Sequence, residues 1–92
     1  MAVALKPRAI SVAFGVVSFF MLDGDKTIRV DVSRELLARI DSPPPDTKDG
    51  YIKRLKRHRR QLARIATEKY KEGQYEPEVR VLVVRIAADD MI

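Results

Sequence analysis

Hydrophobic residues recur at every second position in the first third of the chain. The alternation runs from residue 10 to residue 14, shifts by one position at Gly15 and resumes from residue 17 to residue 21. A period of two is typical of β-strands, and a shift at a glycine indicates a bulge or a tight turn. The 14 residues from Ala9 to Leu22 are too few for a bilayer-spanning helix, and many are β-branched or aromatic. We therefore interpret this segment as a strand or strand pair rather than as a targeting segment.

A β-hairpin is predicted where this segment ends. Asp23 and Gly24 suit the central positions of a type I′ turn, which requires positive φ at both residues. Apolar residues alternate again between residues 28 and 32, which predicts the return strand.

A short helix is predicted next. Ser33 has a side chain that can cap it, and Glu35 is favourably placed in its first turn. The helix should run through Ile40, and the three prolines at residues 43–45 predict its end and a stiff connector.

A longer helix is predicted after the prolines. Asp46 can cap its first turn, with Asp49 three residues further on, and Gly73 can end it in a left-handed conformation after about Glu72. At about 100° per residue, its apolar side chains gather close to one line. These residues are Tyr51, Leu55, Leu62 and Ala66. We expect an amphipathic helix whose opposite face is exposed.

The last strand is predicted from Val79 to Ala87, with Pro77 at its entrance. In residues 81–84, as in residues 16–22, apolar side chains occupy both alternating sets of positions. An antiparallel sheet with helices on one face should alternate instead. This pattern favours a sheet whose second face is also covered, and a homo-oligomer through that face is one interpretation.

These elements predict a single α+β domain over residues 1–92. Its sheet should be mostly antiparallel, with three to four strands and a β-hairpin first. A short and a long helix should be inserted before the C-terminal strand.

Three stretches of sequence support this order of elements. They are Val17-Ser18-Phe19 before Asp23-Gly24, residues 28–37 (IRVDVSRELL), and residues 58–66 (HRRQLARIA) continuing through Lys69-Tyr70 to Gly73. With these stretches the chain resembles a small bacterial family, domain-of-unknown-function family fourteen eighty-eight, over roughly residues 12–89. The resemblance implies a compact α+β domain with two helices and a closing strand, and it implies no activity. The family often has a cysteine where Val30 stands here, so no role of a thiol carries over.

Composition excludes several classes of active site. The 92 residues include no cysteine, which excludes disulfides and cysteine-ligated zinc, and the single histidine excludes a site with two imidazoles. Four glycines form neither of the common phosphate-binding loop patterns. Three pairs of carboxylates are explained by a turn, a helix cap and a polar tail: Asp23/Asp25, Asp46/Asp49 and Asp89/Asp90. We expect a protein that is not an enzyme, with no cofactor and no metal ion.

The net charge of +5 is concentrated on the predicted long helix. Residues 46–73 hold ten Lys and Arg against four Asp and Glu, whereas the rest of the chain holds eight basic and nine acidic residues. Opposite the apolar line lie five basic residues: Lys53, Lys56, Arg57, Arg60 and Arg64. Like charges four residues apart repel by a few tenths of a kcal/mol, so helix stability does not require this arrangement.

Such a face is typical of surfaces that contact phosphate groups without reading sequence. Two alternatives remain: a face that keeps the protein soluble, or a face that pairs with acids of its own fold or of a partner subunit. His58 falls at the edge of the apolar line, where packing explains it. Arg59 lies nearer the apolar side, where a partly buried guanidinium needs a carboxylate, and Asp31 and Glu35 are the candidates. An anchor for a ligand is the other interpretation of Arg59.

The sequence thus predicts a small non-catalytic interaction domain. Sequence-nonspecific nucleic-acid binding through the basic long helix is the alternative, and homo-oligomerisation is a separate hypothesis. We expect a cytoplasmic location, because the first apolar segment is interpreted as a strand or strand pair rather than as a targeting segment. We expect no membrane partner, because the apolar line of the long helix is needed in the core.

Overall fold

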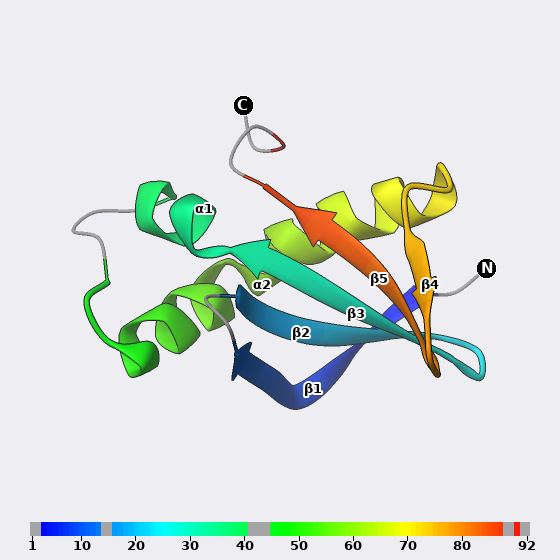
Figure 1. The fold of residues 1–92 in the computed structure, drawn as a ribbon. Coiled ribbons are helices and arrows are strands. Elements are labelled where there is room, and N and C mark those ends of the chain that lie inside the picture. Colours follow the sequence, from blue (N-terminus) through cyan, green and yellow to red (C-terminus); the bar gives the residue numbers. More distant parts are fainter. Residues whose placement is uncertain (1–2, 14–15, 41–44, 88–89, 91–92) are drawn as a thin grey trace.

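The computed structural model describes residues 3–13, 16–40, 45–87 and residue 90. These residues form one sheet of strand order β1-β2-β3-β5-β4 and two helices (Figure 1). The elements are β1 (Val3–Ala13), β2 (Val16–Asp23), β3 (Lys26–Ser33), α1 (Arg34–Arg39), α2 (Lys48–Lys71), β4 (Glu76–Glu78) and β5 (Val81–Ile86). The α+β class and both inserted helices are confirmed. The sheet of the described residues has five strands, however, where three to four were predicted.

Three of the four pairings in this sheet are antiparallel, as expected for a mostly antiparallel sheet. The exception is β3 with β5, which run parallel with Val30 beside Val84. Parallel neighbours need a crossover connection, because a tight turn can join only antiparallel strands. Here the crossover contains α1, α2 and β4, which places the long helix across the sheet (Figure 1).

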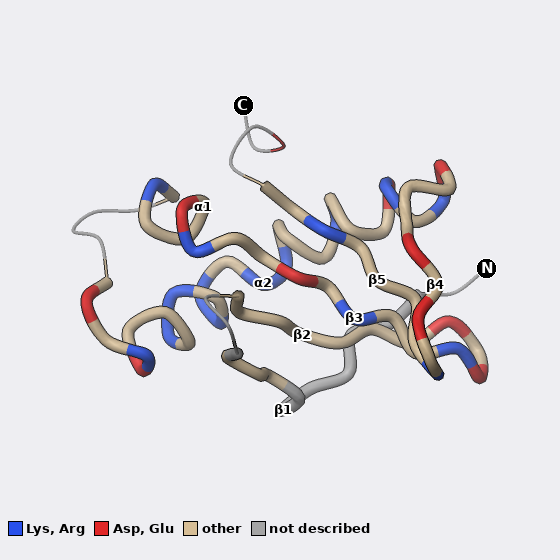
Figure 2. The backbone as a smooth tube through the Cα atoms, viewed as in Figure 1, with Lys and Arg blue, Asp and Glu red and all other residues tan. Residues whose placement is uncertain are grey.

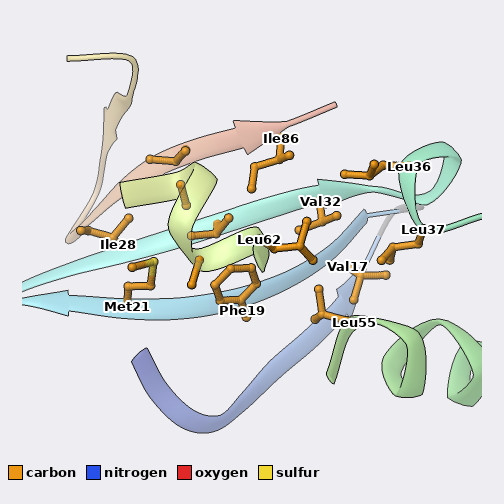
Figure 3. Close-up of a cluster of buried hydrophobic side chains, with 14 of the residues drawn as sticks. Val17, Phe19, Met21, Ile28, Val32, Leu36, Leu37, Leu55, Leu62 and Ile86 are labelled. Carbon is orange, nitrogen blue, oxygen red and sulfur yellow. The ribbon is translucent and has the colours of Figure 1, made fainter. Parts of the chain in front are cut away.

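The core lies between one face of the sheet and the two helices (Figure 3). The apolar line of α2 faces it as predicted, and Leu55, Leu62 and Ala66 are at most 1% exposed. Alternate residues of the central strands meet them: Val17, Phe19, Met21, Ile28, Val30, Val32, Val84 and Ile86. Each large side chain fully buried in this way stabilises the fold by about 1.5–3 kcal/mol. α1 adds Leu36 and Leu37, held in place by the predicted cap, since Ser33 Oγ accepts a 3.0 Å hydrogen bond from the Leu36 N–H.

The opposite face of the sheet also buries side chains. Val83 is 1% exposed and Ser18 is 7% exposed, although both lie on the alternate set of positions to the core residues. A polar network crosses this face, where Asp31 Oδ1 accepts hydrogen bonds from Ser18 Oγ at 2.7 Å and from Arg29 Nε at 2.9 Å. Arg29 Nη2 also lies 3.5 Å from an Oε1 atom of Glu78 on β4. The two-sided apolar pattern therefore does not by itself require a second subunit, and the homo-oligomer stays a prediction.

The first strand pair begins earlier than the apolar pattern indicated. β1 starts at Val3, and its register with β2 shifts between Lys6 and Ile10. β1 and β2 are antiparallel, with Ala13 beside Val16. The predicted turn at Gly15 between them lies outside the described residues.

The next hairpin has a different turn from the one predicted. Asp23 pairs with Lys26, so the central residues are Gly24 and Asp25 rather than Asp23 and Gly24. Gly24 has a φ of +61°, whereas Asp25 is not among the described residues with positive φ. Positive φ at the first central residue alone is typical of a type II′ turn, because glycine accepts that position without steric cost.

The predicted last strand, from Val79 to Ala87, is wrong in its first part. Val79 and Arg80 form the turn of a hairpin between β4 and β5, in which Glu78 pairs with Val81. Arg80 has a φ of +68°, and Val79 is 88% exposed. Val and Arg are not residue types that turns favour. For this reason the sequence pattern did not predict this hairpin. Pro77 lies within β4, an edge strand, where its missing N–H is tolerated.

Candidate nucleic-acid interface

α2 carries the candidate residues and begins one residue later than predicted. Its N-cap is Thr47, whose Oγ1 accepts a 3.0 Å hydrogen bond from the Gly50 N–H, and not Asp46. Pro45 packs so closely on this first turn that a Cβ added at Gly50 would lie 3.1 Å from the Pro45 Cβ. This packing agrees with a helix that is capped by Thr47. The capping pattern in the sequence does not reveal the contact between Pro45 and Gly50. Asp49 still lies in the first turn, where its charge favours the helix dipole.

The predicted end of α2 is confirmed. Gly73 has a φ of +80°, and its N–H donates to the Tyr70 carbonyl at 3.1 Å. The Gln74 N–H donates to the Lys69 carbonyl at 2.8 Å. These two bonds are the pair that ends a helix through a left-handed glycine, and they satisfy carbonyls of the last turn.

The N-terminal half of α2 is fastened to α1. Arg54 Nη1 donates to the Leu37 carbonyl at 3.1 Å, and the Arg34 guanidinium carbon lies 4.8 Å from the centre of the Tyr51 ring. The first contact satisfies a carbonyl that the end of α1 leaves without a helical partner. The second is a cation–π contact.

The C-terminal half of α2 is fastened to the sheet. Tyr70 Oη donates to Asp23 Oδ2 at 2.6 Å, and Lys69 Nζ donates to the Arg85 carbonyl at 2.8 Å. The hydrogen bond to Asp23, together with burial, raises the pKa of Tyr70 to about 12. With contacts at both ends, α2 is held in one orientation on the fold.

The five candidate residues lie on the exposed side of α2, and we call Lys53, Lys56, Arg57, Arg60 and Arg64 the basic face. All five are exposed, as predicted. Lys and Arg occur along the length of α2 in Figure 2. The acids of this helix lie towards its ends, at Asp49 and Glu68. The basic face extends over roughly 16 Å of helix axis, at about 1.5 Å per residue.

Four residues of the basic face make no hydrogen bond or ion pair in the described part of the chain: Lys53, Lys56, Arg60 and Arg64. Elsewhere in the described fold, Lys26, Lys48, Lys71 and Arg80 likewise make none, whereas four other cations are paired. Arg29, Arg39, Lys69 and Arg85 form ion pairs with Asp31, Glu35, Asp90 and Glu76 respectively. One alternative explanation, pairing with acids of the same fold, therefore does not hold for those four residues within the described chain.

The predicted ion pair of Arg59 with Asp31 or Glu35 is not formed in the described part of the chain. Arg59 is half-buried on α2, but Asp31 accepts from Arg29 and Ser18, and Glu35 pairs with Arg39. Arg29 lies two residues from Asp31 on the same side of β3, and this proximity raises the pKa of the Arg29 guanidinium. The period of two could have identified that pair from sequence, because residues two apart on a strand share a face.

His58 is half-buried, in agreement with a position at the edge of the apolar line. In the described residues, no three His, Asp or Glu side chains gather as a metal site would require. A hollow of about 330 Å³ lies beyond the end of α2, and its cations Lys69 and Arg85 are already paired with carboxylates. No described helix is both long enough and apolar enough to cross a membrane.

Comparison of the chain with protein-family models, with curated proteins and with solved structures finds no match. The resemblance to domain-of-unknown-function family fourteen eighty-eight therefore stays a prediction.

Proposed function

We propose that this protein is a non-catalytic binding domain whose basic face contacts the phosphate groups of nucleic acid without reading base sequence. The observation that carries the proposal is a set of four exposed cations that make no hydrogen bond or ion pair with any described residue: Lys53, Lys56, Arg60 and Arg64. Lys and Arg that neutralise phosphates release counterions, and this release drives binding that is independent of sequence.

Repulsion among the cations of α2 favours a role in which they contact a binding partner. Lys56 and Arg60, and Arg60 and Arg64, are like charges four residues apart, and each such pair destabilises the helix by about 0.2–0.5 kcal/mol. No ion pair within the described fold offsets this repulsion. A bound polyanion would attract these cations and offset the repulsion between them.

The non-catalytic part of the proposal rests on the side chains that could do chemistry. Asp23 is hydrogen-bonded to Tyr70, Asp31 to Arg29, and Asp90 to Lys69. Each of these carboxylates is engaged in a structural contact, whereas general acid catalysis needs a carboxyl group in a dry pocket with a raised pKa.

The test is a binding titration with short labelled nucleic acids across a salt series. The wild-type chain should bind with a Kd in the range of about 10⁻⁴–10⁻⁶ M, and the affinity should fall steeply as salt rises. A Lys56→Glu/Arg60→Glu/Arg64→Glu variant should lose this binding. Among the described residues, none of the three side chains has a hydrogen-bond or ion-pair partner that the substitution would disrupt.

A matched control separates the basic face from net charge. Lys26→Glu/Arg39→Glu/Arg80→Glu makes the same change in net charge, from +5 to −1, at exposed positions outside the basic face. It should keep more of the affinity than the basic-face variant does. Equal losses in the two variants would assign the binding to overall charge, and no wild-type binding at low salt would refute the proposed function.

A further inference from the structure

The basic face is a rigid, convex surface whose five residues are all Lys or Arg. These properties favour one kind of nucleic acid over others as its ligand. We infer that its ligand is the B-form DNA duplex, contacted at phosphates on both sides of a groove, in preference to a single strand or an RNA duplex. This inference rests on the proposed function and specifies its partner.

The basic face carries no aromatic surface on which bases could stack. Between residues 53 and 64 the exposed side chains are Lys, Arg and one Gln, with no aromatic ring among them. Tyr51, two residues before this range, is half-buried and covered by Arg34. The exposed large hydrophobic residues of the described chain, Tyr75 and Val79, come after α2 has ended. Proteins that bind single strands stack bases on aromatic side chains and enclose the strand in a groove, and α2 offers neither on this face.

A duplex has a higher charge density along its axis than a single strand. A duplex carries one phosphate per about 1.7 Å of axis and a single strand one per about 3.4 Å. Over the roughly 16 Å of the basic face, a duplex therefore presents about nine charges and a single strand about five. The duplex gives the larger attraction for the same protein surface.

The positions of the four cations around the helix also favour a duplex. Lys56 and Arg64 lie about 80° apart around the helix, with Lys53 and Arg60 between them. An α-helix has the width of the B-DNA major groove, about 12 Å, so residues at the two edges of the face can approach opposite phosphate rows. The major groove of A-form RNA is too narrow for such an approach.

The basic face is preorganised for a stiff ligand. Contacts at Arg54 and at Tyr70 hold the two halves of α2 on the fold, so the cations are attached to a fixed rod. A DNA duplex is itself stiff over about 150 base pairs, and neither partner has to be ordered on binding. A single strand must lose conformational freedom to follow the same line of charges.

The experiment compares three labelled probes of one sequence and equal length: a 16-base-pair DNA duplex, one of its single strands, and the corresponding RNA duplex. We expect the DNA duplex to bind at least tenfold more tightly than either of the others at equal salt. The plot of log affinity against log salt should have a slope of about −4 for the DNA duplex, for four to five phosphate contacts. The single substitution Arg60→Gln should reduce this slope by about one unit, and Arg39→Gln should leave it unchanged.

The outcomes are distinguishable. Equal affinity for single strand and DNA duplex would overturn the duplex inference and leave the proposed function standing. Tighter binding of the RNA duplex would overturn the choice of B-form geometry. No binding of any probe would overturn both. Circular dichroism and thermal unfolding of each variant show whether a lost interaction reflects a lost fold.

Discussion

Tyr70 Oη donates a 2.6 Å hydrogen bond to Asp23 Oδ2, which joins the last turn of α2 to the hairpin between β2 and β3 across 47 positions of sequence. The Tyr70 side chain is 7% exposed, and the centroid of its ring lies 5.1 Å from the centroid of the Tyr75 ring. This bond helps to fix the helix that carries the basic face against the sheet.

Replacing Tyr70 by Phe should therefore destabilise the fold. Hydrogen bonds to charged groups contribute about 1.5–3 kcal/mol, and we expect the lower end because Asp23 keeps some access to water. Urea unfolding followed by circular dichroism measures the change. Tyr75→Phe is the matched control, because Tyr75 is 39% exposed and makes no hydrogen bond from its hydroxyl to another described residue. Equal effects of the two substitutions would contradict a specific role of the Asp23 contact.

The same bond predicts a dependence of stability on alkaline pH. In the folded state the pKa of Tyr70 is raised to about 12 from its ordinary 10.0. As pH rises from 10 towards 12, the unfolded chain releases the phenolic proton while the folded chain retains it, so the free energy of unfolding falls. The stability advantage of wild type over Tyr70→Phe should be fully present below pH 10 and shrink above it. A difference that stays constant from pH 8 to pH 11.5 would show that this proton is not linked to folding.

The basic face predicts a substitution that stabilises the fold while it weakens binding. In Arg60→Glu, repulsion from Lys56 and Arg64 becomes attraction, which should add about 0.8–2 kcal/mol over the two pairs at low ionic strength. The gain should disappear in 1 M salt, where charges on the surface are screened. Thermal unfolding at both salt concentrations measures this. A loss of stability would instead reveal a structural contact of Arg60.

The helix start can be tested by comparing neighbouring caps. Thr47→Ala should cost about 1 kcal/mol of stability, because the Gly50 N–H loses its side-chain acceptor. Asp46→Ala, at the position favoured by the sequence pattern, should change stability by less than about 0.5 kcal/mol. The reverse ranking in chemical denaturation would place the cap at Asp46 after all.

The hairpin turn between β4 and β5 contains a residue under backbone strain. Arg80 has a φ of +68°, a conformation that costs a side chain with a Cβ about 1–2 kcal/mol. Arg80→Gly should raise stability by up to about 1 kcal/mol, and Arg80→Val should lower it, because a β-branched residue fits this region worst. If valine proved as stable as glycine, the left-handed conformation at residue 80 would be refuted.

Features that depend on residues close together in the chain could be predicted from the sequence. The Ser33 cap, the Gly73 terminator and the apolar line through Leu55 and Leu62 each involve one or two helical turns. The exposure of the basic face follows from the same periodicity, because burying one side of a helix leaves the other in solvent.

Features that depend on distant residues required the tertiary structure. The parallel pairing of β3 with β5, the packing of Pro45 on Gly50 and the bond between Tyr70 and Asp23 join segments that no local pattern relates. Ion pairs belong to the same class, since sequence gives the charges but not their distances. The sequence alone therefore determined that α2 is amphipathic and basic. Only the folded arrangement decided that Asp31 pairs with Arg29 rather than with Arg59, and that four cations of the basic face find no acid within the described chain.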